Sequence, residues 1–449
     1  KAEAPFCPSQ TLPRGITVLL RDFQPFAHDL VATSASFSSL GFPVVVTSET
    51  PPYPPVSFPP GVRFVALNPL PSQSPVLTLP GPLVATQHVA LVPDGCRGVP
   101  GLLERMRDEL DKFPLDSPTK MVAAPVGSTP PGCFGLRLEP KAWTVRYLAS
   151  NPLVCHVPRG PSVLLLRSGH FFSLPFPLVP PTLLGVSFQA AFHGWNLQMI
   201  PQPFPSPPAP PLNPHLAWKS QKAAQGARRR LMERLGLKLE VLADGGELWH
   251  GCGKDTPRCF GTIHSQTPEY LLRDLWTPPC CLKALRETAK HVVEVLEEAG
   301  VRYWLEGGSL LGAVRSGDII PWDYDVDLGF YREDLVKCSW LVAAAAGRAG
   351  EDPKGFYWEK APEGEFYRVH FSRWNRLHVD LWPFYPRAGG VMTKDTWLGH
   401  PQDVEFPESF LQPLVPLEFG GFMAMAPNDA RGFLELKFGP GAIERPQYP

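Results

Sequence analysis

Three aspartates at alternate positions, Asp323, Asp325 and Asp327, form the stretch whose spacing says most about chemistry. If this stretch is a β-strand, alternation places the three carboxylates on one face and the intervening Tyr324 and Val326 on the other. Carboxylates gathered on one face repel each other, and a hard divalent cation with oxygen ligands relieves that repulsion. The stretch therefore predicts a Mg²⁺ site, with Mn²⁺ as the alternative ion. A solvated acidic turn is the structural alternative, and the alternation with apolar residues argues against it.

A glycine turn precedes the aspartates, where the strand-like run 301–305 stops at Gly307 and Gly308. Two adjacent glycines let a ligand come close to the backbone. Ser309 is expected to cap a short helix over 310–314, and the amide groups at the start of that helix would face a phosphate. The turn therefore predicts a phosphate-binding segment beside the metal site.

The glycine turn followed by Asp-x-Asp resembles the nucleotidyltransferase superfold, in which the turn holds nucleotide phosphates and the acids hold metal. The resemblance implies a further carboxylate on a later strand, and Asp380 lies in an alternating run over 377–382. A structural role is the default for one aspartate in a strand, but the motif favours catalysis here. In this interpretation Asp325 and Asp327 hold the metal, with Asp323 as a ligand or a support. Asp380 is either a further ligand or the base that accepts the proton of an acceptor hydroxyl.

Basic side chains around the acids are candidates for contacts with phosphate, although each one taken alone is by default a surface or structural residue. Arg315 and His378 are assigned to cofactor binding together with the glycine turn. The other candidates are Lys360, Arg368 and Lys437.

Three longer stretches carry a resemblance to a known family, namely 304–312 (WLEGGSLLG), 320–327 (IPWDYDVD) and 378–384 (HVDLWPF). They resemble the family that includes fukutin and the bacterial phosphorylcholine transferases, which decorate surface sugars. The resemblance implies a metal-dependent phosphotransferase that takes ribitol 5-phosphate from CDP-ribitol and releases CMP. It implies as acceptor the phosphorylated O-mannosyl glycan of α-dystroglycan, already bearing one ribitol phosphate.

Two other functions fit the same motifs. One is true nucleotidyl transfer, in which attack at the α-phosphorus releases pyrophosphate or a polyol phosphate. The other is a catalytically inactive scaffold that binds glycoproteins, and the intact set of glycines and acids argues against it. Release of CMP favours the phosphotransferase over true nucleotidyl transfer.

Four cysteines gather within thirty residues, at Cys252, Cys259, Cys280 and Cys281. Four thiols at this density suit a structural, tetrahedral Zn²⁺ site. Two disulfides are the alternative, since a secretory compartment is oxidising, although each of two adjacent cysteines would need its own partner. The family resemblance implies a zinc finger-like loop over 252–281, which favours zinc. Of the other cysteines, Cys133 and Cys155 are candidate disulfide partners, and those left unassigned are Cys7, Cys96 and Cys338.

Periodicity predicts the elements that position the acids. Apolar residues recur on one face of 282–299, which predicts a helix that stops at Gly300 and feeds the strand 301–305. Further helices are predicted over 333–347 and 429–438. Strands are predicted over 355–360, 366–371 and 377–381.

The first half of the chain alternates strands with helices, which predicts a parallel α/β sheet. The predicted strands are 16–20, 43–47, 62–67, 88–92, 121–125 and 163–166, and the predicted helices are 27–40, 101–113 and 187–195. This arrangement resembles the nucleotide-binding half of a sugar-nucleotide glycosyltransferase. Asp94 follows one strand without an Asp-x-Asp partner, so a non-catalytic stem over 1–200, serving assembly or acceptor capture, is expected.

The proline-rich residues 201–214 (PQPFPSPPAPPLNP) predict a stiff linker between two domains. The α/β stem precedes it, and an α+β catalytic domain of the nucleotidyltransferase type follows over 215–449. This second domain is expected to begin with a basic helix over 215–235. The helix is either a solvated or interface helix, or an electrostatic guide for an anionic acceptor.

Composition limits the remaining possibilities. The 449 residues carry a net charge of −1, which gives no argument for nucleic-acid binding. No run of about 18 apolar residues occurs, so no membrane span is expected within the sequence. The family resemblance implies a cytoplasmic tail and one transmembrane helix upstream, a type II protein of the Golgi lumen, self-association, and fukutin as a further partner.

Overall fold

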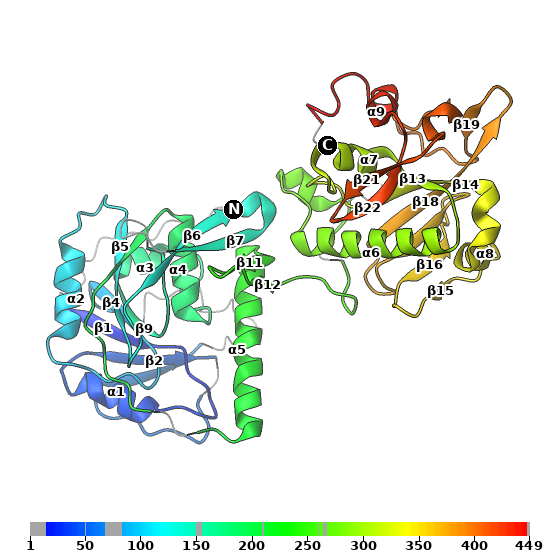
Figure 1. Ribbon diagram of the computed structural model, residues 1–449. Helices are drawn as coiled ribbons and strands as arrows, with labels where there is room; N and C mark the ends of the chain where they lie inside the picture. The colour runs from blue at the N-terminus through cyan, green and yellow to red at the C-terminus, as the bar shows by residue number, and fades with distance from the viewer. Residues whose placement is uncertain are drawn as a thin grey trace. The chain divides into compact units, whose positions relative to one another are not determined.

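The computed structural model describes residues 15–49, 51–67, 83–149, 155–208, 211–258, 260–263 and 267–446 (Figure 1). The chain forms two compact units, the first over Lys1–Leu138 and Val145–Leu248 and the second over Glu139–Thr144 and Trp249–Pro449. Both the expected linker and the basic helix therefore lie in the first unit, whereas the sequence assigned the helix to the catalytic domain.

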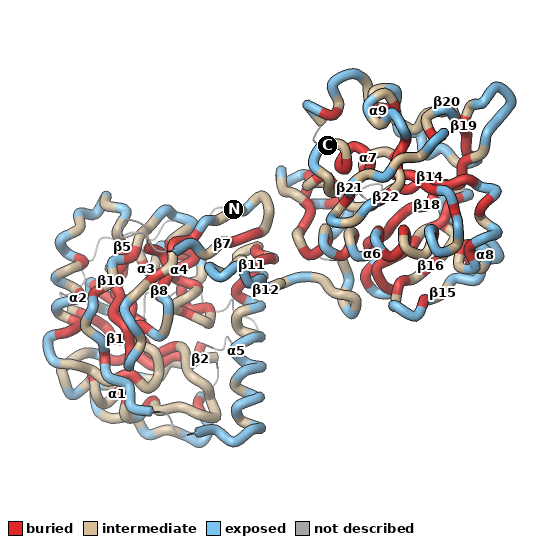
Figure 2. Tube along the Cα trace, in the orientation of Figure 1, coloured by how far each residue is buried: buried red, intermediate tan, exposed pale blue. Residues whose placement is uncertain are grey.

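The basic helix α5 (Pro214–Leu235) belongs to the first unit because Leu231 and Met232, near its end, are buried there against Phe188. Its Arg228 donates from Nε to the fully buried Glu240 at 2.7 Å. Most other side chains of α5 are exposed, so the helix is solvated over most of its length and is anchored at its C-terminal end (Figure 2).

A seven-stranded sheet forms the centre of the first unit, in the order β10-β5-β9-β4-β1-β2-β3. Its strands are β1 (Ile16–Leu20), β2 (Val44–Ser48), β3 (Val62–Ala66), β4 (His88–Val92), β5 (Thr119–Pro125), β9 (Ser162–Arg167) and β10 (Asn196–Met199). Neighbours in the sheet are parallel except at β9, which runs antiparallel to both β4 and β5. The sheet is thus mixed rather than wholly parallel.

Helices cover both faces of this sheet. The alternation of β1 sends Val18 into a core with α1 (Leu30–Ser38) and α2 (Leu102–Asp111), and Leu19 into a separate core with α3 (Ser168–Ser173) and α4 (Thr182–Phe192). Strands buried on both faces need continuous apolar runs, so β1 (ITVLL) and β4 (HVALV) can be predicted as strands from the sequence.

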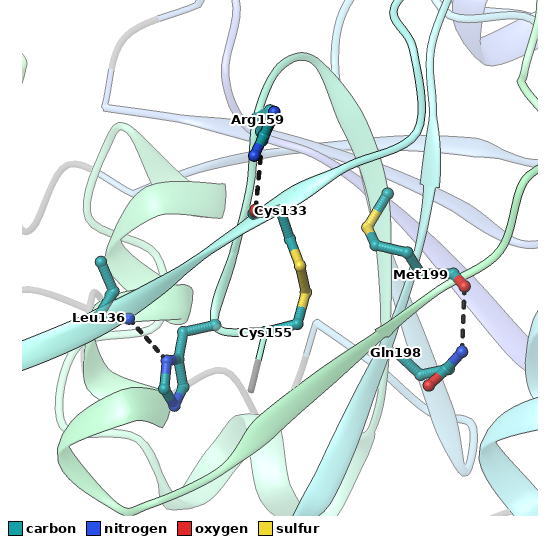
Figure 3. The surroundings of a disulfide bond; sticks show 7 residues. Cys133, Leu136, Cys155, Arg159, Gln198 and Met199 are labelled. Atoms are coloured by element: carbon teal, nitrogen blue, oxygen red, sulfur yellow. Dashed lines mark hydrogen bonds between the residues drawn. A yellow bond between two sulfur atoms is a disulfide. The ribbon is translucent and has the colours of Figure 1, made fainter. Parts of the chain in front are cut away.

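A smaller five-stranded sheet completes the first unit, in the order β12-β11-β7-β6-β8. Its strands are β6 (Cys133–Glu139), β7 (Thr144–Ala149), β8 (Val157–Pro158), β11 (Leu239–Val241) and β12 (Glu247–Trp249). A disulfide joins Cys133 to Cys155, with a Cα–Cα distance of 5.7 Å (Figure 3). The predicted pairing of these two cysteines is present, and it fastens the start of β6 to the segment that precedes β8.

The second unit is built on a sheet whose main path is β13-β14-β18-β17-β16-β15. The strands are β13 (Tyr303–Leu305), β14 (Val326–Tyr331), β15 (Gly350–Glu351), β16 (Tyr357–Lys360), β17 (Tyr367–His370), β18 (His378–Arg387), β19 (Val391–Thr393) and β20 (Phe406–Pro407). β14 and β18 are parallel, and the other neighbours are antiparallel. A separate hairpin pairs β21 (Val415–Phe419) with β22 (Phe422–Ala426).

The long helix α6 (Pro279–Glu298) packs its apolar face, including Leu285, Val292 and Leu296, into the core of the second unit. It starts earlier than predicted because proline is well tolerated in the first turn. The other helices are α7 (Gly307–Ser316), α8 (Ser339–Ala345) and α9 (Ala430–Phe438). The helix predicted over 333–347 is divided at Cys338 into a 3₁₀ segment and α8.

Within the described ranges, the helices lack the combination of length and apolar character that crossing a bilayer requires.

Candidate active site

The acidic stretch is only partly a strand. β14 begins at Val326, so Asp323 and Asp325 lie in the loop that connects α7 to β14, and Asp327 lies in the strand itself. The expectation that one strand carries all three carboxylates is therefore corrected. Because Asp323 and Asp325 lack ladder hydrogen bonds, other contacts must set the position of this loop.

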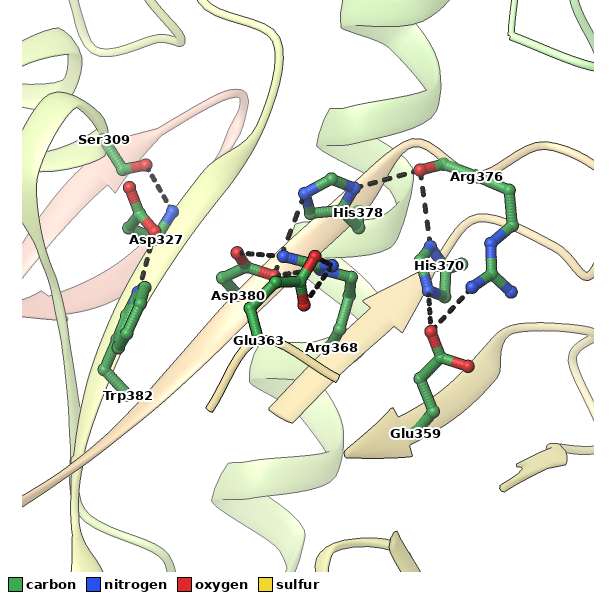
Figure 4. A network of polar contacts seen from close by, with 10 residues as sticks. All are labelled: Ser309, Asp327, Glu359, Glu363, Arg368, His370, Arg376, His378, Asp380 and Trp382. Atoms are coloured by element: carbon green, nitrogen blue, oxygen red, sulfur yellow. Dashed lines mark hydrogen bonds and ion pairs between the residues drawn. The ribbon is translucent and has the colours of Figure 1, made fainter. Parts of the chain in front are cut away.

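Asp327 is held from several sides. Its backbone N–H donates to Ser309 Oγ at 2.9 Å, and its carboxylate accepts from Trp382 Nε1 at 2.9 Å (Figure 4). Its backbone carbonyl accepts from the Glu306 N–H at 3.0 Å. These bonds tie the start of β14 to the glycine turn and to the neighbouring strand β18.

The glycine turn forms the first turn of α7, which begins at Gly307 and not after Ser309. The Ser309 hydroxyl is occupied by the Asp327 N–H, and it is not the helix cap that the sequence suggested. Gly307 has a φ of 53°, a conformation that glycine adopts without strain. A Cβ on Gly308 would lie 2.7 Å from Asp323 Oδ2. A side chain would therefore strain the backbone at Gly307 and displace the Asp323 carboxylate at Gly308.

Asp380 is paired with an arginine from the next strand. Arg368 on β17 is in register with Asp380 on β18 and donates to both carboxylate oxygens, at 2.8 and 3.1 Å. Arg368 also forms an ion pair with Glu363 (Figure 4), and the distance from Arg368 Nη1 to Glu363 Oε1 is 3.2 Å. His378 Nε2 lies 3.8 Å from Asp380 Oδ1. Arg368 was one candidate for phosphate contact, with a surface or structural role as the default, and the structure shows it paired with Asp380.

Clustering makes the acids hard to ionise in the absence of a cation. Burial raises the pKa of Asp323 to about 6. Burial and the charge of Asp380 raise the pKa of Asp327 to about 7. Burial, followed by the charges of Asp327, Asp323 and Asp380, raises the pKa of Asp325 well above its usual value. Such a site is stabilised by a bound cation.

The donor atoms fit a hard divalent cation. One ligand atom each from Asp325, His378 and Asp380 lie within 4.8 Å of one another. Two carboxylates suit Mg²⁺ or Mn²⁺, and an imidazole is compatible with Mn²⁺. His378 was assigned to phosphate contact, and its position makes it a candidate ligand as well. Burial lowers the pKa of His378 to about 4, which keeps its ring neutral.

The remaining predicted basic residues differ in their positions. Arg315 is exposed in the last turn of α7, at the opposite end of the helix from the glycine turn, so it is not brought to the acids. Lys360 pairs with Glu365 at 2.7 Å. Lys437 on α9 is buried and forms an ion pair with Glu306, the residue before the turn.

Two cavities adjoin the acids. One of about 750 Å³ is lined by residues that include Gly308, Asp323, Tyr324 and Lys437. Another of about 380 Å³ is lined by Arg368 and His378, the two neighbours of Asp380, among other residues. Asp323 therefore borders the larger cavity, and the neighbours of Asp380 border the smaller one.

Three of the predicted zinc ligands are close together. Cys252 Sγ lies 3.2 Å from Cys280 Sγ and 3.3 Å from Cys281 Sγ. The fourth predicted ligand, Cys259, lies outside the described residues, as does Cys7. The three described sulfurs form a group that can hold a metal ion, and none of them is in a disulfide. Cys96 and Cys338 are free and buried.

The carboxylate of Asp94, in the first unit, is held by hydrogen bonds from neighbouring residues. It accepts from the Asp29 N–H at 2.8 Å and from Thr33 Oγ1 at 3.4 Å, near the start of α1. In the described part of the first unit, no group of three potential metal ligands gathers around it.

The contacts that hold the acids were not predicted from the sequence. Trp382 was part of a recognised stretch but received no role, although its indole N–H binds Asp327. The pairing of Arg368 with Asp380 depends on strand register, which a prediction of two neighbouring strands leaves open.

Comparisons with known proteins cover both units. A family profile described as the fukutin-related protein stem domain matches residues 3–243, and one described as the LicD/FKTN/FKRP nucleotidyltransferase domain matches residues 300–429. Relatives named ribitol 5-phosphate transferase FKRP, from Homo sapiens and Mus musculus, are each 51% identical over 458 residues, covering 100% of this chain and 91% of the relative.

More distant similarities are confined to part of the chain. Ribitol-5-phosphate transferase FKTN of Mus musculus is 29% identical over 106 residues, covering 24% of this chain and 22% of the relative. The crystal structure of lincomycin-bound lincosamide antibiotic adenylyltransferase LnuA covers 33% of this chain and 83% of that chain, with 14% identity and a TM-score of 0.23. A similarity at that level carries no argument about this site.

Proposed function

The chain belongs to the family of fukutin-related protein, and from this membership we propose that it transfers ribitol 5-phosphate to a glycan acceptor. The observation that carries the proposal is the convergence of Asp325, His378 and Asp380 next to the glycine turn. Relatives that align with the whole chain bear the name of this activity.

The proposed donor is CDP-ribitol and the proposed metal is Mg²⁺ or Mn²⁺, held by Asp325, Asp327 and Asp380, with His378 as a further candidate. When bound, the cation stabilises negative charge on the diphosphate and on the departing CMP. An acceptor hydroxyl oxygen attacks the phosphorus that carries ribitol, and the bond from that phosphorus to the CMP oxygen breaks.

The residues of the chain supply position and charge for this step. The start of α7 presents amide groups beside the acids, where a helix N-terminus favours phosphate, and Gly308 leaves room for the approach. Asp380 is either a ligand or the base that receives the acceptor proton. Arg368 donates one hydrogen bond to each carboxylate oxygen of Asp380, so both oxygens already have a charged donor.

The proposed acceptor is the phosphorylated O-mannosyl glycan of α-dystroglycan that already bears one ribitol phosphate. We also propose residence in the Golgi lumen, self-association, contact with fukutin, and a structural Zn²⁺ bound by Cys252, Cys280, Cys281 and the predicted Cys259. The three grouped sulfurs support the zinc site.

The deciding experiment measures CMP release from CDP-ribitol by the purified chain, with and without acceptor glycopeptide and with and without Mg²⁺. We expect release that requires both additions. Free ribitol 5-phosphate, with CMP transferred to the acceptor, would indicate true nucleotidyl transfer. Binding of the glycopeptide with no product under any condition would indicate an inactive scaffold.

A further inference from the structure

A buried threonine outside the recognised motifs contacts the backbone of the acidic loop. Thr277 is 1% exposed and lies in the segment that leads into α6. Its Oγ1 donates to the Asp323 carbonyl at 2.5 Å, and its backbone N–H donates to the Pro321 carbonyl at 2.8 Å. One residue thus binds the loop at two points, immediately before Asp325.

A tyrosine supports this threonine. Tyr270 is 2% exposed, and its OH lies 2.7 Å from Thr277 Oγ1. The single proton of the threonine hydroxyl is directed to Asp323, so the tyrosine OH is the donor in the bond between the two side chains. The ring of Tyr270 packs edge-on against Phe260 of the cysteine loop, with centroids 5.1 Å apart. Tyr270 therefore fixes the orientation of the Thr277 hydroxyl.

The acidic loop needs such a support because its carboxylates repel each other. Asp323 and Asp325 precede the first ladder bond of β14 and cannot rely on the sheet for their position. A second contact holds the beginning of the loop, where Arg286 of α6 binds both carboxylate oxygens of Asp318 at 2.7 Å. The lead-in and first turns of α6 thus hold the loop against the start of β14.

We propose that Thr277 is a positioning residue, which holds the acidic loop so that Asp325 can meet Asp380 and His378 around a divalent cation. This inference rests on the proposed function, because it takes the acids as the metal ligands. Thr277 also lies close in sequence to the cysteine group, since Cys280 and Cys281 are in the first turn of α6, which Thr277 precedes.

The test compares Thr277→Val, which keeps the shape and removes the hydroxyl, with Thr277→Ser, which keeps the hydroxyl. Thr288→Val is the matched control, because Thr288 is also buried and its hydroxyl binds the Ala284 carbonyl at 2.8 Å within α6, away from the loop. Tyr270→Phe is a milder variant that leaves the threonine hydroxyl in place. Each variant of the whole 449-residue chain is dialysed free of Mg²⁺ and titrated with Mn²⁺. Bound ion is followed by electron paramagnetic resonance, and the melting temperature is measured in parallel.

We expect Thr277→Val to weaken Mn²⁺ affinity about fivefold or more, because the loss of one buried hydrogen bond has an effect of about this size. Thr277→Ser should bind Mn²⁺ with nearly the affinity of the unaltered chain. The Mn²⁺ affinity of Tyr270→Phe should lie between those of Thr277→Ser and Thr277→Val. Thr288→Val should lower the melting temperature to a similar degree as Thr277→Val while leaving Mn²⁺ affinity unchanged. Equal Mn²⁺ affinity in Thr277→Val and Thr288→Val would overturn the inference.

The parent proposal is tested separately in the same titration. If the unaltered chain and Asp325→Asn bind Mn²⁺ equally, the acids are not the metal site and the proposed function fails at that point. If Thr277→Val does not fold, the Mn²⁺ affinity of Tyr270→Phe tests the inference instead. An affinity equal to that of the unaltered chain would then overturn it.

Discussion

Asp327 and Asp380 are register partners on the adjacent parallel strands β14 and β18. These two carboxylates are distant in the sequence, and they therefore project from neighbouring strands next to each other. Arg368 neutralises Asp380 from the other neighbouring strand, whereas among the described residues the side-chain donor to Asp327 is the neutral indole N–H of Trp382. The excess negative charge at this point of the sheet is the physical reason to expect a divalent cation.

Removing one charge of the cluster should abolish catalysis without unfolding the chain. We predict that Asp325→Asn and Asp327→Asn each lower the turnover of CMP release by on the order of 10²-fold or more, because a metal ligand is lost. Asp395→Asn is a control, since Asp395 is a half-exposed partner of Arg332 outside the cluster. Near-normal turnover of either active-site variant at saturating Mg²⁺ would contradict the assignment.

The close approach of the helix start to the acids can be tested with one methyl group. In Gly308→Ala the new Cβ would meet Asp323 Oδ2 at 2.7 Å and must displace the carboxylate. Displacement of the Asp323 carboxylate is expected to lower turnover by up to about 10²-fold. Gly350→Ala, where nothing lies within 4 Å of the added Cβ, should leave turnover unchanged. The prediction fails if the two alanine variants have the same turnover.

The two units should contribute unequally to chemistry. Asp94→Asn keeps an oxygen that can accept from the Asp29 N–H, so we expect most activity to remain and the stability to fall by at most about 1–2 kcal/mol. Asp380→Asn should lose activity because a site carboxylate is removed. Both variants should keep the size in solution of the unaltered chain, measured by light scattering. Loss of CMP release in a folded Asp94→Asn protein would place chemistry in the first unit.

The cysteine group should bind one structural Zn²⁺. Because thiolate ligation couples metal binding to folding, a strong chelator should lower the melting temperature of the chain, and added Zn²⁺ should restore it. Elemental analysis should find one zinc per chain. Absence of zinc, together with mass spectra showing oxidised Cys252 and Cys280, would favour the disulfide alternative.

Patterns with a short period predicted much of this structure. The apolar run around Asp380 placed that residue on a strand, and the periodicity before Gly300 predicted α6 to within a few residues. These predictions succeed because burial of an apolar face imposes the helix or strand period directly on the sequence. The spacing of Cys133 and Cys155 did not dictate their pairing, which the structure nevertheless shows.

Contacts that depend on long-range geometry were not predictable. The position of α5 is decided by a few buried side chains near its end, whereas the proline-rich segment before it suggested a domain boundary there. Thr277 precedes two prolines and carries no periodic signal, because its role comes from a loop that lies far along the chain. The proposed role of Cys259 as a zinc ligand stays a prediction.

The buried ion pair of Lys437 with Glu306 has a consequence for biosynthesis. The glycine turn leaves the ribosome well before α9 does, so on the nascent chain Glu306 has the indole N–H of Trp304 as a donor but lacks this cation. A buried carboxylate without its cation is costly, so the turn should reach its final geometry only after α9 has been synthesised and packed. Premature termination before α9 should therefore disable the site itself, and such products should be substrates for protein quality control.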